Sequence, residues 1–276
     1  TLPVNAMAFD PVTPSTIYVG SLGNVVKTAD GGATWVDSGV GLSGRNVSTL
    51  VIDPSTPSTL YASVHWPANG SGLGVSKSAD AGGSWTPTAN GLPQMDAPLL
   101  AIALARPPTL YASGRINSVW KSIDGAASWT TVYSGLPVDA TAIAVDPIDP
   151  ETVYVASRST FSYVSGNPRD QPQECWAPTI LKSTNGAAQF RQVWTTPSPS
   201  SCYLGTIRSF VFDPSTPGAI YAFGSDPIVS TDRGETWAHL SLPGLAGAGI
   251  YCFAIGPIPA GRILAIRSFG KANFLV

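Results

Sequence analysis

The sequence predicts an all-β fold, a β-propeller of four-stranded antiparallel blades, and three observations lead to this prediction. A short motif that ends in tryptophan recurs along the 276 residues. A second motif, Asp-Pro followed by a tyrosine-centred apolar run, recurs in phase with the first. No segment shows the 3.6-residue apolar period of an amphipathic helix. Two signals that share one period indicate a repeat fold, and a period of about 45 residues is typical of propeller blades.

The tryptophan motif first occurs at residues 27–35, where it reads Lys-Thr-Ala-Asp-Gly-Gly-Ala-Thr-Trp. It returns at residues 77–85, 121–129 and 230–237, and a degraded copy that lacks the aspartate and the tryptophan occupies residues 182–190. The Asp or Asn positions lie 44 to 61 residues apart, at Asp30, Asp80, Asp124, Asn185 and Asp232.

The Asp-Pro motif ends an apolar run at residues 10–11, 53–54, 146–147 and 213–214. A tyrosine-centred run follows each time, and the third unit keeps this run although Ala-Arg-Pro at 105–107 replaces Asp-Pro. The tyrosines are Tyr18, Tyr61, Tyr111, Tyr154 and Tyr221. Asp before Pro favours a turn, so these aspartates are expected to end strands.

Each unit is expected to form four short strands, because Gly, Pro, Ser and Asp interrupt its apolar runs. In the first unit these are Val4–Phe9, Thr16–Gly20, Val25–Thr28 and Thr34–Asp37. The first strand is apolar on both faces, which suits an innermost strand packed between neighbouring blades.

The units begin near residues 4, 46, 96, 139 and 206, and a partial sixth begins near Gly249. The sixth would supply the strands Ile250–Ile255, Arg262–Ile266 and Asn273–Val276. We therefore expect a single propeller domain over residues 1–276 that lacks residues at one or both ends. Six blades are the first choice, and seven if the native chain is longer.

The tryptophan motif resembles the Asp-box, or bacterial neuraminidase repeat, with the pattern S/T-x-D-x-G-x-S/T-W. The Asp-box occurs in sialidases, xyloglucan-cleaving glycoside hydrolases, sortilin-type receptors and photosystem II assembly factors. The resemblance implies that each motif is the hairpin turn between the third and fourth strands of a blade. The aspartate would set the turn and the tryptophan would be buried, at Asp30 and Trp35, Asp80 and Trp85, Asp124 and Trp129, and Asp232 and Trp237. Because these aspartates belong to separate blades, they are not expected to form a catalytic or metal-binding set.

Composition excludes several classes of function. The formal net charge of −2 provides no field that would capture nucleic acid. No apolar run approaches the roughly 18 residues of a membrane span, so none is expected. Glycine-rich phosphate loops, haem-attachment cysteine pairs and metal-ligand spacings are not found in the sequence, so no cofactor and no metal is expected.

The irregular segments predict where ligands bind. In a propeller, the loops between strands two and three of a blade share one face with the loops that join successive blades. Insertions at residues 65–72 and 157–178 fall on that face, which is usually the binding face of a repeat array. The structural alternative is that these loops only cover the channel mouth. The candidate ligand-binding residues are His65, Trp66, Arg115, Arg158, Phe161, Tyr163, Trp176 and Tyr203.

Cysteine placement predicts a disulfide. Cys175 lies in the second insertion, and Cys202 lies in the loop that leaves the same unit, so both are expected in one sector of the same face. Cys252 lies in a predicted strand and is expected to be a small buried residue. A disulfide implies an oxidising compartment, so a secreted or periplasmic location is favoured.

Enzyme hypotheses find weaker support. Sialidases carry an early Arg-Ile-Pro, but here the first arginine is Arg45 and the only glutamates are Glu151, Glu174 and Glu235. A glycosidase needs two carboxylates that flank one bond, and the weak candidates are Asp96 and Asp139, which begin successive units. We therefore expect a non-enzymatic propeller that binds a carbohydrate or protein partner, with a glycoside hydrolase as the alternative.

Overall fold

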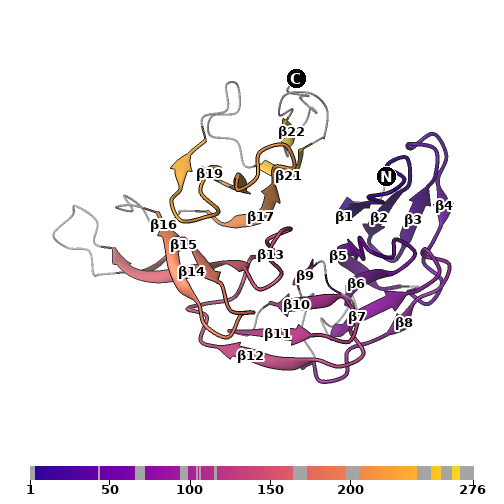
Figure 1. Ribbon diagram of the computed structural model, residues 1–276, viewed down its shortest axis with the longest axis horizontal. Coiled ribbons are helices and arrows are strands. Elements are labelled where there is room, and N and C mark those ends of the chain that lie inside the picture. The colour runs from indigo at the N-terminus through magenta and orange to yellow at the C-terminus, as the bar shows by residue number, and fades with distance from the viewer. Residues whose placement is uncertain are drawn as a thin grey trace. The chain divides into compact units, whose positions relative to one another are not determined.

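The computed structural model describes residues 4–42, 44–65, 72–93, 99–103, 105, 107–114, 117–163, 173–196, 205–240, 250–255 and 263–267. Within these ranges the regular structure is all β, and it forms five four-stranded antiparallel sheets and one two-stranded sheet (Figure 1). In each four-stranded sheet the strands are hydrogen-bonded in sequence order. This is the meander of a propeller blade, and the prediction of an all-β propeller is confirmed.

The strands of the first three blades are β1 (Val4–Phe9), β2 (Ile17–Ser21), β3 (Val25–Thr28), β4 (Val36–Asp37), β5 (Asn46–Ile52), β6 (Leu60–His65), β7 (Gly72–Ser78), β8 (Thr86–Pro87), β9 (Leu99–Ala103), β10 (Thr109–Ser113), β11 (Ser118–Ser122) and β12 (Thr130–Ser134). The later strands are β13 (Ala142–Val145), β14 (Val153–Tyr163), β15 (Gln173–Ser183), β16 (Arg191–Thr195), β17 (Ile207–Phe212), β18 (Ile220–Gly224), β19 (Ile228–Ser230), β20 (Ala238–His239), β21 (Ile250–Ile255) and β22 (Ile263–Arg267).

The chain divides into two compact units. The first holds residues 1–135 and 147–151, with blades 1 to 3, and the second holds residues 136–146 and 152–276, with blades 4 and 5 and the pair β21–β22. Within the first unit β1, β5 and β9 follow one another along one side, and β4, β8 and β12 lie along the other (Figure 1). Within each unit the first strands of successive blades pack side by side, β1 on β5 and β5 on β9 in the first unit and β13 on β17 in the second, as expected of innermost strands.

The strand bounds predicted for the first blade agree closely with those of the structure. β1 and β3 have the predicted bounds, β2 is displaced by one residue, and β4 is shorter than predicted because it begins at Val36. The prediction of six blades is confirmed in part. Five blades are complete, and the described residues of the sixth unit form only the pair β21–β22. The predicted strand Asn273–Val276 lies outside the described residues.

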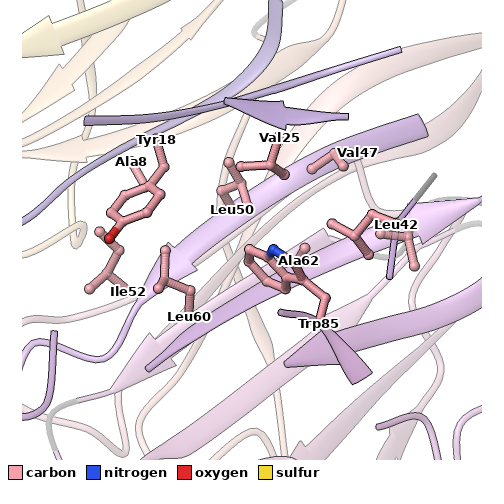
Figure 2. Close-up of a cluster of buried hydrophobic side chains, with 11 residues drawn as sticks. Ala8, Tyr18, Val25, Leu42, Val47, Leu50, Ile52, Leu60, Ala62 and Trp85 are labelled. Atoms are coloured by element: carbon pink, nitrogen blue, oxygen red, sulfur yellow. The ribbon is translucent and has the colours of Figure 1, made fainter. Parts of the chain in front are cut away.

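Apolar side chains fill the space between neighbouring blades of a unit. Figure 2 shows the cluster between blades 1 and 2, in which Tyr18 lies near Ile52 and Leu60 and Val25 lies near Leu50. The innermost strand β5 packs on both of its faces, because Leu50 lies in this cluster and Val51 packs against the cluster between blades 2 and 3. A second cluster joins blades 2 and 3, and a third joins blades 4 and 5.

In blades 1 and 4, a tyrosine and a lysine on adjacent strands both donate to a carbonyl oxygen in the Asp-box of the next blade. In blade 1, the Tyr18 hydroxyl and the Lys27 ammonium both donate to the Ala81 carbonyl oxygen, at 3.1 Å and 3.2 Å. The Lys27 Nζ also lies 5.2 Å from the Tyr18 ring centroid. The tyrosine is the centre of the second sequence motif, so that motif marks a contact between blades as well as a strand.

Candidate functional site

The Asp-box aspartates are engaged by their own turns. In blade 2, one carboxylate oxygen of Asp80 accepts hydrogen bonds from the Ser78 hydroxyl and the Ser84 amide, at 2.7 Å and 2.9 Å. The other oxygen accepts from the Ser84 hydroxyl at 2.7 Å. These bonds stabilise the ionised form and lower the pKa of Asp80 to about 2, with the Ser84 hydroxyl as the largest cause. A carboxylate held in this way is a poor general acid or base near neutral pH.

The other boxes repeat this geometry. Hydroxyls four residues downstream, from Ser128 and Thr236, are the largest cause that lowers the pKa of Asp124 and Asp232 to about 2. The pKa of Asp30 is lowered by Thr34 and Thr28 in the same way. The degraded copy keeps the turn with a neutral residue, because the Asn185 side-chain oxygen accepts from the Gln189 amide at 3.0 Å. The shape of the turn therefore does not require a charge.

Glycine is less necessary to this turn than the sequence suggested. Two successive residues have positive φ at each box, and the second of them is Ala126 in blade 3 and Ala187 in blade 4. An alanine in this conformation costs roughly 1–2 kcal/mol. The hydrogen bonds of the turn and the burial of both alanines offset that cost.

The box tryptophans do not all follow the expectation of burial. Trp85 and Trp129 are each only 4% exposed, but Trp35 is 43% exposed and Trp237 is half-buried. The indole nitrogens of Trp85 and Trp129 donate to the preceding blade, whereas those of Trp35 and Trp237 donate within their own turns, to Gly32 and Gly234. The expectation was wrong for Trp35, because the two buried box tryptophans are covered by the blade before them and no described blade of its unit precedes blade 1. It was met only in part for Trp237, which bonds its own turn although blade 4 precedes it.

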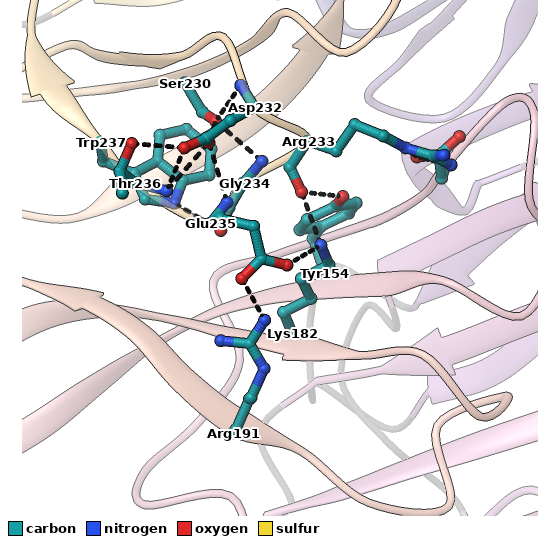
Figure 3. Close-up of polar contacts among 11 residues, drawn as sticks. Tyr154, Lys182, Arg191, Ser230, Asp232, Arg233, Gly234, Glu235, Thr236 and Trp237 are labelled. Carbon is teal, nitrogen blue, oxygen red and sulfur yellow. Dashed lines mark hydrogen bonds and ion pairs between the residues drawn. The ribbon is translucent and has the colours of Figure 1, made fainter.

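Glu235 lies within the last box and belongs to the contact between blades 4 and 5. Its carboxylate pairs with Lys182 at 2.6 Å and with Arg191, and the Lys182 ammonium also bonds the Arg233 carbonyl at 2.7 Å (Figure 3). Lys182, then Arg191, lower the pKa of Glu235. These contacts occupy Glu235 in the packing of blades.

The insertion in the fourth unit is a regular hairpin rather than an irregular loop. β14 and β15 each run for 11 residues and pair without a register shift from Val153↔Ser183 to Tyr163↔Gln173. The expectation of irregular structure was therefore wrong at 157–163 and 173–178. The alternation of small polar and larger residues in Ser-Arg-Ser-Thr-Phe-Ser-Tyr is a strand signal that could have shown this.

The hairpin separates the predicted binding residues onto two faces. Phe161 pairs with Cys175, and that face is buried at Cys175 and Ala177. Thr160 pairs with Trp176 on the opposite face, where Trp176 is 47% exposed. We call this second face the open face of the hairpin, and its side chains are Arg158, Thr160, Ser162, Glu174 and Trp176. Only Arg158 and Trp176 of this set were predicted from the sequence.

A cation stacks on the aromatic ring of the open face. The Arg158 guanidinium lies over the Trp176 ring, with 5.7 Å between the guanidinium carbon and the ring centroid. The Arg158 Nε is buried and has no hydrogen-bond partner. A cation fixed beside an exposed indole can bind a carboxylate or stack against a planar or apolar group.

A second polar group lies on blade 2. His65 ends β6, and its Nε2 lies 3.3 Å from the side-chain nitrogen of Asn46 at the start of β5. The His65 Nδ1 and the Asn46 Oδ1 are buried without hydrogen-bond partners. The sequence indicated His65 but not Asn46, because only the register of β5 and β6 brings the two together.

The remaining predicted residues have different outcomes. Asp139 precedes β13 and is half-buried, and the Ser157 hydroxyl at the base of the hairpin lies 3.4 Å from its carbonyl oxygen. Tyr163 is described only as the last residue of β14. Asp96, Trp66, Arg115, Tyr203 and Cys202 lie outside the described residues. Among those that are described, no cluster of three metal-ligating side chains occurs, and no helix could cross a membrane.

The repeated blades and their Asp-box turns define the fold class as an Asp-box β-propeller. Comparison with solved structures agrees. The GH74 xyloglucanase from Xanthomonas campestris is 16% identical with a TM-score of 0.62, over 96% of this chain and 42% of that one. The GH74 enzyme of Niastella koreensis is 19% identical with a TM-score of 0.61, over 89% of this chain and 41% of that one. The chain thus spans about two fifths of the length of these enzymes.

A structure of YCF48 bound to D1 peptide matches over 96% of this chain and 91% of that chain, with 15% identity and a TM-score of 0.50. No family model and no curated protein matches the sequence. At these identities the likeness shows the fold alone. The fold is shared by glycoside hydrolases and by a peptide-binding protein, so function has to be argued from the site.

Proposed function

We propose that this propeller is a non-enzymatic binding protein, and that the open face of the β14–β15 hairpin binds a peptide segment of a protein partner. The observation that carries the proposal is the Arg158–Trp176 pair, a guanidinium whose Nε is buried without a partner, stacked on an indole that is 47% exposed. Exposed tryptophan and arginine are the side chains that most often dominate protein interfaces. The likeness in fold to YCF48, whose structure holds a peptide, supports the same class of ligand.

The test is selection of a displayed library of random octapeptides on the purified protein. We expect enriched sequences that bind the wild-type protein and lose at least about tenfold in affinity on Trp176→Ala, the usual effect of truncating an interface anchor. Trp35→Ala is the matched control, because Trp35 is exposed to a similar degree at 43% but lies in a turn of blade 1. Absence of enrichment, or equal loss in both variants, contradicts the proposal.

Glycoside hydrolysis is the second candidate function, favoured by the GH74 likeness and by the position of Asp139 beside the hairpin base. It requires Asp96 and Asp139 to act as a pair. Release of reducing ends from a panel of plant and bacterial polysaccharides, lost in both Asp96→Ala and Asp139→Ala, would establish it in place of the binding function. Retention of a polysaccharide without turnover would identify a carbohydrate ligand.

A further inference from the structure

The outer part of the β14–β15 hairpin is a two-stranded ribbon. β13 pairs with β14 only over Val153–Ala156, and β16 pairs with β15 only between Thr179 and Lys182. In the part of the chain that the structure describes, no strand pairs with β14 beyond Ala156 except β15. An edge of this kind presents a row of backbone donors and acceptors to any extended chain.

The register shows which backbone groups point outward. The Ala156 carbonyl accepts from the Thr141 amide at 2.8 Å, so the peptide groups of Ala156 face away from β15. In a strand the N–H and C=O of one residue point to the same side, and this side alternates along the chain. Because β14 pairs with β15 without a shift, the peptide groups of Arg158, Thr160 and Ser162 also point away from β15.

The two edges of the ribbon are not equivalent. On β15 the Pro178 carbonyl accepts from the Thr196 amide, so the residues of β15 that point outward are Pro178, Trp176 and Glu174. Proline has no N–H to donate, and it is a common device that protects an edge from pairing. β14 has no proline at its outward positions, so its edge is the better acceptor of an added strand.

The side chains beside the β14 edge indicate the chemistry of the occupant. The outward residues of β14 carry the open-face side chains, of which Arg158 lies over Trp176 and keeps a buried Nε without a partner. Side chains directly opposite in an antiparallel pair lie about 4.5–5.5 Å apart. A carboxylate at the residue opposite Arg158 would therefore reach the guanidinium, while a neighbouring apolar side chain would contact the exposed indole.

We infer that the outer edge of β14 binds an extended acidic peptide by strand addition, with main-chain hydrogen bonds at Arg158, Thr160 and Ser162 and a peptide carboxylate on Arg158. This inference rests on the proposed function, and it deepens it by naming the binding mode and the ligand class. Main-chain bonds supply affinity in strand addition, and the alternating side chains supply specificity.

The experiment uses the octapeptides selected on the full protein, labelled with fluorescein and titrated by fluorescence anisotropy. Thr160→Pro removes the outward N–H without breaking a bond to β15, and Thr160→Ala is its control because it keeps that N–H. We expect Thr160→Pro to weaken binding at least about tenfold and Thr160→Ala less than about threefold. Arg158→Gln should weaken peptides with Asp or Glu and leave their Asn or Gln counterparts unchanged.

A second measurement does not depend on the folding of a variant. Two versions of the peptide are compared, one N-methylated at its odd-numbered residues and one at its even-numbered residues. One version should not bind and the other should bind as before, because the N–H of only every second residue of the peptide faces the edge. If both N-methylated peptides, or Thr160→Pro and Thr160→Ala, had equal effects on binding, strand addition would be overturned. If binding still depended on Trp176 in that case, the proposed function would stand. Failure to select any peptide would overturn both. Self-association that Thr160→Pro abolishes would identify a second copy as the occupant and overturn the peptide.

Discussion

The indole nitrogen of Trp85 lies 2.7 Å from the carbonyl oxygen of Ser38 and donates to it, so the Asp-box of blade 2 is hydrogen-bonded to the segment that follows β4 of blade 1. The Trp85 amide donates to the Val40 carbonyl in the same segment at 2.8 Å. Trp129 repeats both bonds on blade 2, to Thr88 and Asn90. In blades 2 and 3 the box tryptophan is therefore an anchor between blades, and the box turn positions it.

We expect Trp85→Ala and Trp129→Ala to destabilise the protein by about 3–5 kcal/mol each. Each substitution removes a buried aromatic side chain and the indole hydrogen bond to the preceding blade, and leaves only the backbone amide bond. Trp35→Ala should cost less than half as much, because Trp35 is 43% exposed and bonds only within its own turn. Thermal unfolding of the three variants measures the order. Equal shifts in Tm would show that the box tryptophans act within their own blades.

The close approach of the box tryptophan to the turn that leaves the preceding blade requires glycine, at Gly41 in blade 1 and at Gly91 in blade 2. Gly41 has a φ of +94°, and a Cβ there would lie 2.3 Å from the Trp85 carbonyl oxygen. Gly41→Ala should therefore lower stability by about 2 kcal/mol or more, from the strained φ and the displaced backbone. Gly31→Ala is the control, because its φ is +71° but a Cβ would meet no atom within 4 Å. A denaturant midpoint that falls equally for both would show that only the φ matters.

The repeat arithmetic and the turn chemistry were enough to predict the blades, because both signals are local and recur. The sequence could not show that Trp35 is exposed, since its burial depends on a neighbouring blade and not on the motif. The regular hairpin of β14 and β15 was also missed, because the extra length relative to the other units was interpreted as a loop and the alternation of small polar and larger residues in 157–163 was overlooked. Asn46 was missed for a related reason: only strand register places it beside His65.

Acid should destabilise the protein in a narrow pH window. Hydrogen bonds hold the pKa of Asp80, Asp124 and Asp232 at about 2 in the folded protein, below their ordinary value of 3.8, and the pKa of Asp30 is lowered as well. The unfolded chain thus binds protons more tightly, so this stabilisation is fully present above about pH 4 and is lost as the pH falls toward about 2. We expect Tm to change little from these groups between pH 7 and 5 and to fall below pH 4.

The control for the acid prediction is Asp80→Asn, which follows the natural example of Asn185 and removes one titrating carboxylate. Its Tm should depend less steeply on pH below 4 than that of the wild-type protein. If the protein lost its stability entirely above pH 5, titratable groups other than the Asp-box aspartates would be responsible, and the prediction would be wrong.

The lysine contacts between blades should differ in strength. Lys182 bonds both the Arg233 carbonyl and the Glu235 carboxylate, whereas Lys27 bonds the Ala81 carbonyl and stacks on Tyr18. Lys182→Met should cost about 1–3 kcal/mol, since it removes an ion pair as well as a bond to a carbonyl oxygen, and Lys27→Met about 1 kcal/mol. Lys182→Met should also raise the pKa of Glu235 toward its ordinary value, which an NMR titration measures. An unchanged pKa of Glu235 would contradict the pairing.

The pairing of Cys175 with Cys202 remains a prediction, and the structure shows where Cys175 lies. Cys175 is 1% exposed on the buried face of the hairpin, opposite the face that carries Trp176. A bridge there would hold the outer part of the hairpin to the segment that leaves blade 4 and contribute roughly 3 kcal/mol in the loop-entropy model. Titration of unfolded, unreduced protein should then find one free thiol, from Cys252, and Cys202→Ser should lower Tm as much as reduction does. Three free thiols would exclude the bridge and, with it, the argument for an oxidising compartment.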